Sequence, residues 1–92
     1  MVPLATGSQT AGSIIRPASF CGVVGFKPSF GKISVAGVKS LAQSLDTMGC
    51  FGRTVEDVAL GVAVMSGDHL LAQVQELHNK PRMAVCKTLA WS

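Results

Sequence analysis

Residues 7–17 read G-S-Q-T-A-G-S-I-I-R-P, a run of small side chains that opens into a short apolar segment. Gly7, Ala11 and Gly12 carry little or no side chain, so the backbone there can approach a ligand closely. Backbone N–H groups that are freed at such a turn can point at a developing negative charge, which is the geometry of an oxyanion hole. Ser13 follows these residues directly, and its hydroxyl is therefore a candidate nucleophile. A Gly/Ser-rich turn alone is a weak signal, because most such turns are ordinary loops.

The same stretch resembles the nucleophile segment of the amidase signature family, whose common form is G-S/T-D/Q-T-G/A-G-S followed by an apolar pair, Arg and Pro. The resemblance continues through residues 20–31, which read F-C-G-V-V-G-F-K-P-S-F-G, and resumes at residues 44–49 (S-L-D-T-M-G) and 53–57 (R-T-V-E-D). Three blocks in the right order and at the right spacing are far more specific than one glycine motif. The likeness is nearly continuous over residues 6–67, and residues 81–91 are similar to the strand that follows in these enzymes.

The resemblance implies an α/β fold, a mixed β-sheet flanked by helices, of which this chain would hold only a central piece. Residues 1–92 would then be a fragment of a single amidase-signature domain. The resemblance also implies a Ser–Ser–Lys triad, a serine-nucleophile arrangement that does without histidine. The lysine and the bridging serine of that triad lie upstream of the nucleophile. Because this chain begins only a dozen residues before Ser13, we expect both to be absent from it.

By the same resemblance, Ser13 is the nucleophile, and the backbone amides of Thr10, Ala11, Gly12 and Ser13 hold the oxyanion. Many family members have Gly at the place of Ala11, but Ala is also common there. Gln9 stands where many members have Asp. It marks a subgroup and can alter the local hydrogen bonding, but it is not expected to be catalytic.

Several polar residues look catalytic by type but are expected to be structural. Arg16 would pair with a carboxylate or a carbonyl. Lys27 falls in the family's G-F/L-K-P segment after the nucleophile, and not at the place of the catalytic lysine. Asp46, Arg53 and Asp57 match positions that hold the loop and the helix in these folds. Arg53 and Asp57 are four residues apart and can also form an ion pair on a helix face.

Neither the histidines nor the cysteines indicate a metal site, and no cofactor is expected. His69 and His78 have no Cys or acid at ligand spacing, so solvated surface histidines are expected rather than a zinc site. Cys21, Cys50 and Cys86 are odd in number and widely spaced, which favours a reduced, cytoplasmic setting. Cys50 stands where the family usually has proline, so a less rigid turn is expected there.

The composition suits a piece of a protein core. Hydrophobic residues make up 48% of the chain and charged residues only 14%, against roughly a quarter charged in an ordinary soluble domain. The net charge is +3, and the 8 Lys and Arg residues are scattered, which argues against a nucleic-acid surface. The start of the chain lacks a leader pattern, and the longest apolar stretch, residues 58–65, is far short of the roughly 20 residues that span a bilayer. Nucleic acid and membrane are therefore not expected as partners.

A short helix is predicted over residues 13–20, with Pro17 within its first turn or so and Gly22 as its stop. Residues 23–26 form an apolar run that is typical of a buried strand. The following residues, 27–44, are rich in turns, with a brief second strand as a candidate at Ile33, Val35 and Val38.

The clearest helix is predicted over residues 54–66. Thr54 can cap it, Asp57 lies three residues on as in a capping box, and Gly67 stops it. A weaker helix is predicted over residues 70–78, ended by residues 79–81, and a buried strand over residues 83–86. Strands 23–26 and 83–86 are expected to share one sheet, with helix 54–66 packed across its face. Apolar residues at helical spacing predict the buried stripe of that helix: Val55, Val58, Ala59, Val62 and Met65.

The leading hypothesis is hydrolysis of a carboxylic amide C–N bond by acyl transfer, with a small-molecule amide as the substrate of the whole enzyme. The sequence leaves the identity of that amide and the oligomeric state open. Because the proton-handling residues are expected upstream, the chain alone would be nearly inert. One alternative is a catalytically dead remnant that acts as an interaction piece. Another is the A subunit of a tRNA-dependent amidotransferase, whose usual Asp-Thr-Gly-Gly-Ser contrasts with the Q-T-A-G-S of residues 9–13.

Overall fold

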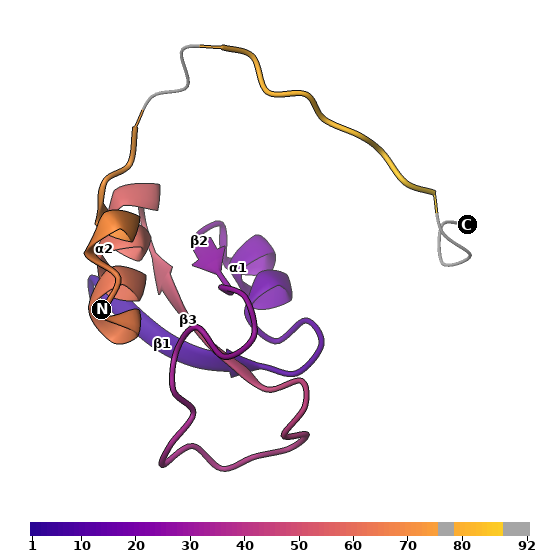
Figure 1. Cartoon of the computed structure of the whole chain (residues 1–92), viewed down its shortest axis with the longest axis vertical. Helices are drawn as coiled ribbons and strands as arrows, with labels where there is room; N and C mark the ends of the chain where they lie inside the picture. Colours follow the sequence, from indigo (N-terminus) through magenta and orange to yellow (C-terminus); the bar gives the residue numbers. More distant parts are fainter. Residues whose placement is uncertain (76–78, 88–92) are drawn as a thin grey trace.

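The computed structural model describes residues 1–75 and 79–87. This part of the chain forms a small three-stranded sheet with one helix on each face (Figure 1). No helix among the described residues is both long enough and apolar enough to cross a membrane. In chain order the elements are β1 (Leu4–Gln9), α1 (Ile15–Cys21), β2 (Val24–Phe26), β3 (Thr47–Gly52), α2 (Val55–Ser66) and one turn of 3-10 helix, η1 (His69–Ala72).

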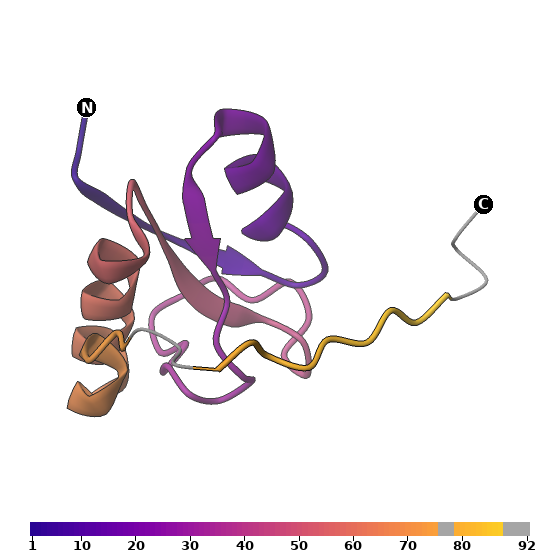
Figure 2. The ribbon, with the colours of Figure 1, turned by 90° about the horizontal axis from the view of Figure 1, so that it is seen from above.

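The sheet has the order β1-β3-β2, and β3 pairs antiparallel with both neighbours. Cys50 of β3 lies opposite Thr6 of β1 and Phe26 of β2, which fixes the register. Alternate residues of β3 face opposite helices: the Cα of Gly49 faces Ile14, at the start of α1, whereas Cys50 faces α2. Seen from above, α1 and α2 accordingly lie on opposite sides of the sheet (Figure 2). The expected α/β class, a sheet flanked by helices, is confirmed, but the three described strands pair only in antiparallel fashion, and the expected mixed pairing is not found among them.

Helix α1 follows the expectation closely. It begins at Ile15 instead of Ser13, so Pro17 falls in its first turn, where its missing N–H costs little. Gly22 ends the helix at φ 63°, a left-handed conformation that favours glycine, and its N–H turns back to the carbonyl of Ser19. The predicted stop is therefore confirmed.

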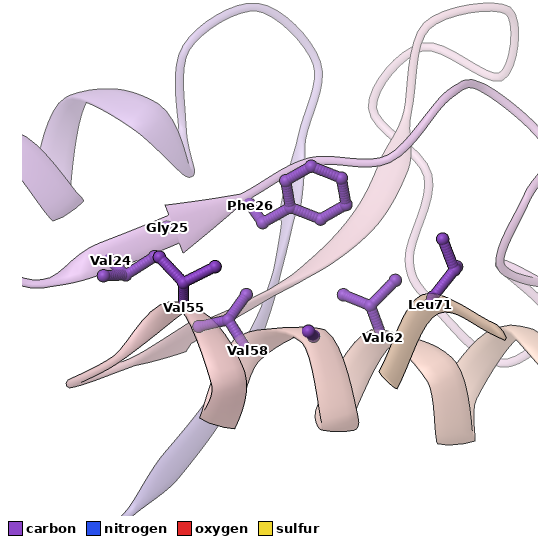
Figure 3. Close-up of a pocket in the computed structure, with 8 residues that line it drawn as sticks. Val24, Gly25, Phe26, Val55, Val58, Val62 and Leu71 are labelled. Carbon is purple, nitrogen blue, oxygen red and sulfur yellow. The ribbon is translucent and has the colours of Figure 1, made fainter. Parts of the chain in front are cut away.

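Helix α2 is also confirmed, with its capping residue. The Thr54 hydroxyl accepts a hydrogen bond from the Asp57 N–H at 3.2 Å, which satisfies one of the free donors of the first turn. Val58 and Val62 are buried in the core, together with Ile33 and Cys50. The predicted stripe is wrong at one end: the Val55 side chain is 55% exposed. Position 55 is the first residue of the helix, and its side chain lines an open groove beside β2 (Figure 3).

The long connection from β2 to β3 is a series of turns, as expected, but it contains no strand. Ile33, Val35 and Val38 lie in turns and bends, and of the three only Ile33 is buried. Gly31 and Gly37 take φ values of 75° and 80° on either side of Ile33 and Val35. These reversals interrupt the extended backbone that a strand requires.

Two C-terminal expectations are wrong. The helix predicted over 70–78 is replaced by the single turn η1, whose Leu71 packs against the core, while residues 76–78 lie outside the described residues. The strand predicted over 83–86 does not form: Met83 and Val85 are exposed, and the segment runs away from the sheet (Figure 1). A strand is stabilised by a hydrogen-bonded neighbour, and no described strand lies beside this segment. The expectation that it shares a sheet with β2 is therefore also wrong.

Candidate active site

The turn that carries Ser13 joins the end of β1 to the start of α1, and the Gln9 side chain fixes its shape. Gln9 is 6% exposed. Its Oε1 accepts hydrogen bonds from the N–H groups of Ile14 at 2.8 Å and Ile15 at 3.1 Å. Its Nε2 donates to the carbonyl of Ala11 at 2.8 Å. One buried amide group thus caps α1, whose N-cap residue Ile14 has no side-chain cap of its own, and also holds the middle of the turn.

Ser13 is exposed on this turn, two residues before the first residue of α1. Within residues 1–75 and 79–87, its hydroxyl makes no hydrogen bond, and the N–H groups of Ala11, Gly12 and Ser13 donate to no other group. The carbonyl of Gly12 accepts from the Arg16 N–H at 2.9 Å, which begins the helical pattern. An accessible hydroxyl next to unused backbone donors is the arrangement that acyl transfer at a serine needs.

A second anchor reaches the turn from the residue just before β3, where Thr47 pairs with Gln9 at the end of β1. Thr10 donates its hydroxyl proton to Oδ1 of Asp46 at 2.5 Å, across 36 positions of sequence. The other carboxylate oxygen of Asp46 accepts from the Ser40 hydroxyl and from the N–H groups of Leu41 and Ala42, at 2.7 to 2.9 Å. The Thr10 hydroxyl, followed by the Ala42 amide, lowers the pKa of Asp46 from 3.8 to about 2. Asp46 is therefore ionised at neutral pH, and its expected role in holding the loop is confirmed.

The basic residues near the motif do not supply a base for Ser13. The Lys27 ammonium donates to the carbonyl of Pro28 at 2.6 Å, which agrees with a structural role. Arg16 is exposed, and its side chain lies beside Gly12. The expected pairing of its guanidinium with a carboxylate or carbonyl is not found in the described part of the chain.

The expected ion pair between Arg53 and Asp57 is also not found among the described residues, whose salt bridge joins Lys32 to Asp68 at 2.6 Å. The helix begins at residue 55, so Arg53 precedes it and does not share a helix face with Asp57. The turn expected at Cys50 from the family's proline does not form. Cys50 lies inside β3, with its side chain against α2.

Nothing in the described residues indicates a metal centre. No group of three or more potential metal-ligating side chains occurs there. His69 is exposed in η1, in agreement with a surface role, and His78 lies outside the described residues.

An apolar groove of about 230 Å³ opens between β2 and α2 (Figure 3). The groove lies on the α2 side of the sheet, whereas the Gln9 side chain, and a Cβ built at Gly25, point to the α1 side. The Gly25 backbone still lines the groove. Neither Ser13 nor Asp46 lines it, so the groove is separate from the serine turn. Its walls are Val24, Gly25, Phe26, Val55, Val58, Ala59, Val62 and Leu71.

The serine turn was predictable from the motif, but the importance of two of its supports was not. Gln9 was expected only to alter local hydrogen bonding, yet it makes three bonds that define the turn. The hydrogen bond between Thr10 and Asp46 could not be predicted from the sequence, because the two residues are 36 positions apart and no local pattern indicates that they meet.

Comparison with known proteins gives this arrangement its context. A family model described as Amidase matches residues 1–85. The chain is 57% identical over 67 residues to the A subunit of a glutamyl-tRNA(Gln) amidotransferase from Sulfurihydrogenibium sp., covering 73% of this chain and 14% of that protein. It is 58% identical over 65 residues to the protein of the same name from Chlamydia pneumoniae, covering 71% and 13%.

A solved structure of an amidase family protein from Bacillus anthracis superimposes with a TM-score of 0.70 at 47% identity. That match covers 72% of this chain and 13% of the solved chain. This chain therefore spans about a seventh of the length of the relatives that it matches. The family model, the sequence identity and the superposition agree, and we conclude that the chain belongs to the amidase family, of which it carries one segment.

Proposed function

We propose that this chain is the nucleophile segment of a serine amidase, and that Ser13 is the nucleophile. The observation that carries the proposal is an exposed serine on a tight turn that the buried Gln9 side chain holds rigid. The turn leaves the N–H groups of Ala11, Gly12 and Ser13 without partners in the described residues. These donors, with the Thr10 amide, would receive the oxyanion.

In the proposed reaction the Ser13 oxygen attacks the carbonyl carbon of a carboxylic amide. A Ser13 O–C bond forms, the carbonyl oxygen becomes negatively charged, and the backbone amides stabilise that charge. When the tetrahedral species collapses, the C–N bond breaks and the amine leaves with a proton. Water then cleaves the acyl-serine ester and releases the carboxylic acid. The serine proton must pass to a base, and the family resemblance supplies a serine and a lysine upstream for this purpose.

Because no base faces Ser13 in the described part of the chain, we expect the 92-residue chain to lack amidase turnover. Removal of a base or an oxyanion donor generally costs about 10² to 10⁴ in rate. We accordingly propose the amidase activity for the whole protein and not for this chain alone. A small-molecule amide substrate and a cytoplasmic setting are likewise proposed for the whole protein.

Labelling by a fluorophosphonate probe tests the proposal. The short chain should not label at Ser13, whereas a protein extended upstream to include the family's lysine and second serine should label there. In the extended protein, Ser13→Ala should abolish both labelling and turnover. Ser19→Ala is the matched control, because Ser19 is an exposed serine of the adjoining helix α1, and it should preserve both.

Strong labelling of Ser13 in the short chain would mean that a local base exists, with Lys27 as the first suspect. Labelling that persists in the extended Ser13→Ala protein would mean that another serine is the nucleophile. An extended protein that is folded but neither labels nor turns over would favour the alternative of a catalytically dead remnant.

A second candidate function is favoured by the names of the relatives. Both amidotransferase relatives compared above carry the name of the A subunit of a glutamyl-tRNA(Gln) amidotransferase. Gln9 and Ala11 differ from the usual Asp-Thr-Gly-Gly-Ser of that subunit and argue against this function. The 57% identity over 67 residues is the stronger observation, because it extends over most of the chain. In this alternative the parent protein works inside an assembly, and the amide nitrogen passes to an acceptor. Ammonia release from glutamine by the full-length protein, with and without its partner proteins, distinguishes it from a free-standing amidase.

A further inference from the structure

The Asp46 carboxylate joins the long loop before β3 to the serine turn by hydrogen bonds. Asp46 lies immediately before β3 and is 6% exposed. Its two oxygens have separate tasks: Oδ2 accepts three hydrogen bonds from residues 40–42 of its own loop. Oδ1 accepts from the Thr10 hydroxyl at 2.5 Å.

This division makes Oδ1 a fixed acceptor. Two of the three donors on Oδ2 are backbone N–H groups, of Leu41 and Ala42, so the carboxylate plane is set by the loop backbone before Thr10 is considered. A hydrogen bond from a hydroxyl to an ionised carboxylate is shorter and roughly twice as strong as a neutral one. Thr10 is the first residue after β1 and begins the turn that ends at Ser13. The bond to Asp46 therefore fixes the Thr10 side chain, and through it the backbone of Thr10, whose N–H is one of the proposed oxyanion donors.

Gln9 alone does not fix this part of the turn. Its hydrogen bonds reach Ala11, Ile14 and Ile15, and none of them reaches Thr10. Thr10 is instead tied through Asp46 to the loop of residues 40–46, which precedes β3. In the same loop lies a hollow of about 300 Å³, lined by Val35, Val38, Ser40, Gln43 and Asp46.

We propose that Asp46 is a positioning residue for acyl transfer, which acts through the Thr10 hydroxyl to hold the backbone donors of residues 10–13 in place. The inference rests on the proposed function of Ser13. It goes beyond a role in closing the loop, because loop closure uses Oδ2 only. Catalytic donors that shift by about 1 Å lose on the order of 10²-fold in rate, so a fixed Thr10 has a measurable consequence.

Three variants separate positioning from loop closure. Thr10→Val removes the hydroxyl at nearly constant volume and breaks only the bond to Oδ1. Ser40→Ala breaks one bond to Oδ2 and is the matched control. Thr10→Ser keeps the hydroxyl and should rescue the effect of Thr10→Val.

The first measurement is made on the isotope-labelled chain by NMR and needs no activity. Thr10→Val should shift the amide resonances of residues 10–13 and speed their hydrogen exchange, while Ser40→Ala should change only residues 40–46. The second measurement is kcat of the full-length protein. We expect Thr10→Val to lower kcat by about 10- to 100-fold with little change in KM, Thr10→Ser to recover most of that loss, and Ser40→Ala to remain near the wild-type value.

The proposal is overturned if Thr10→Val leaves the amides of residues 10–13 unchanged. It is equally overturned if Ser40→Ala lowers kcat as much as Thr10→Val does. A full-length protein without any amide-cleaving activity would refute the proposed function. The NMR comparison would still decide whether Asp46 holds the turn, so the two failures are distinguishable. If the short chain gives poor spectra, the same amides are observed in the full-length protein.

Discussion

Gly61 of α2 lies against Cys50 of β3, and its replacement by alanine tests how closely the helix packs on the sheet. A methyl group at position 61 would lie 2.8 Å from Sγ of Cys50. The Cys50 side chain is 1% exposed and belongs to the buried core. Side-chain carbons do not approach a sulfur atom this closely, so either α2 moves away from β3 or Cys50 takes another rotamer in a filled core.

Two opposing effects determine the sign of the change in stability. In the interior of an exposed helix, Gly→Ala is favourable by roughly 1 kcal/mol. Forcing an extra methyl group into a packed core costs about 1 to 3 kcal/mol. Val58 and Val62 are buried on either side of Gly61 and limit the room for relaxation, so the upper part of that range applies. We expect Gly61→Ala to destabilise the contact between α2 and the sheet by about 1–2 kcal/mol net.

The assay follows Cys50 labelling by a thiol reagent in a chain whose exposed Cys21 and Cys86 are replaced by serine. Burial raises the pKa of the Cys50 thiol, so it reacts only when α2 opens away from β3. A cost of about 1–2 kcal/mol corresponds to labelling that is roughly 5 to 30 times faster. Val64→Ala, at a position of the same helix that faces solvent, is the control and should not accelerate labelling. Slower labelling in Gly61→Ala would show that helix propensity alone governs position 61, and would refute the packing argument.

Three further outcomes are expected. The purified 92-residue chain should be marginal or prone to aggregate, because its sheet has open edges and much exposed apolar surface; a cooperative denaturant transition of a soluble monomer with the usual 5–15 kcal/mol would contradict this. Asp46 has a folded-state pKa of about 2 against an ordinary 3.8, so its stabilisation is present above pH 3.8 and is lost as the pH falls toward 2. Between about pH 4 and 2, Asp46→Asn should therefore lose less of its folded circular-dichroism signal than the wild type does. The pKa of Asp68 is also lowered, by Lys32, but this carboxylate is present in both proteins and contributes equally to their acid response. Thr54→Ala should destabilise α2 by about 1 kcal/mol, measured as faster hydrogen exchange at Asp57, whereas unchanged exchange there would argue against the cap.

The two helices were predictable because their ends carry local signals. Thr54 and Gly67 bound α2, and Gly22 ends α1, each through a backbone or side-chain preference that acts within a few residues. Strands β1 and β3 had no comparable signal. Their sequences, L-A-T-G-S-Q and T-M-G-C-F-G, contain glycine and small residues with low strand propensity. Pairing between segments more than 30 residues apart stabilises them instead.

The opposite error occurred at residues 83–86. Met83 and Val85 alternate with smaller residues, as in a strand. Such a pattern indicates that the segment could form a strand, but it does not show whether a neighbouring strand is available to pair with it. Both edges of the described sheet, β1 and β2, remain without this segment. For the candidate site, the motif predicted the position of Ser13, whereas the roles of Gln9 and Asp46 depend on three-dimensional contacts.

The position of Ser13 depends on how closely α1 lies against the sheet, and two glycines outside the motif set that distance. A Cβ at Gly25 of β2 would lie 2.6 Å from the Cβ of Ala18, in the middle of α1. A Cβ at Gly49 of β3 would lie 2.6 Å from Cδ1 of Ile14. Ile14 and Ala18 are both buried, so they have little freedom to move aside. Because Ile14 follows Ser13 directly, a side chain at either glycine would displace the start of α1 and the serine with it. The glycines of β2 and β3 are thus part of what positions the nucleophile, a role that nothing in the sequence pattern indicated for Gly25 or Gly49.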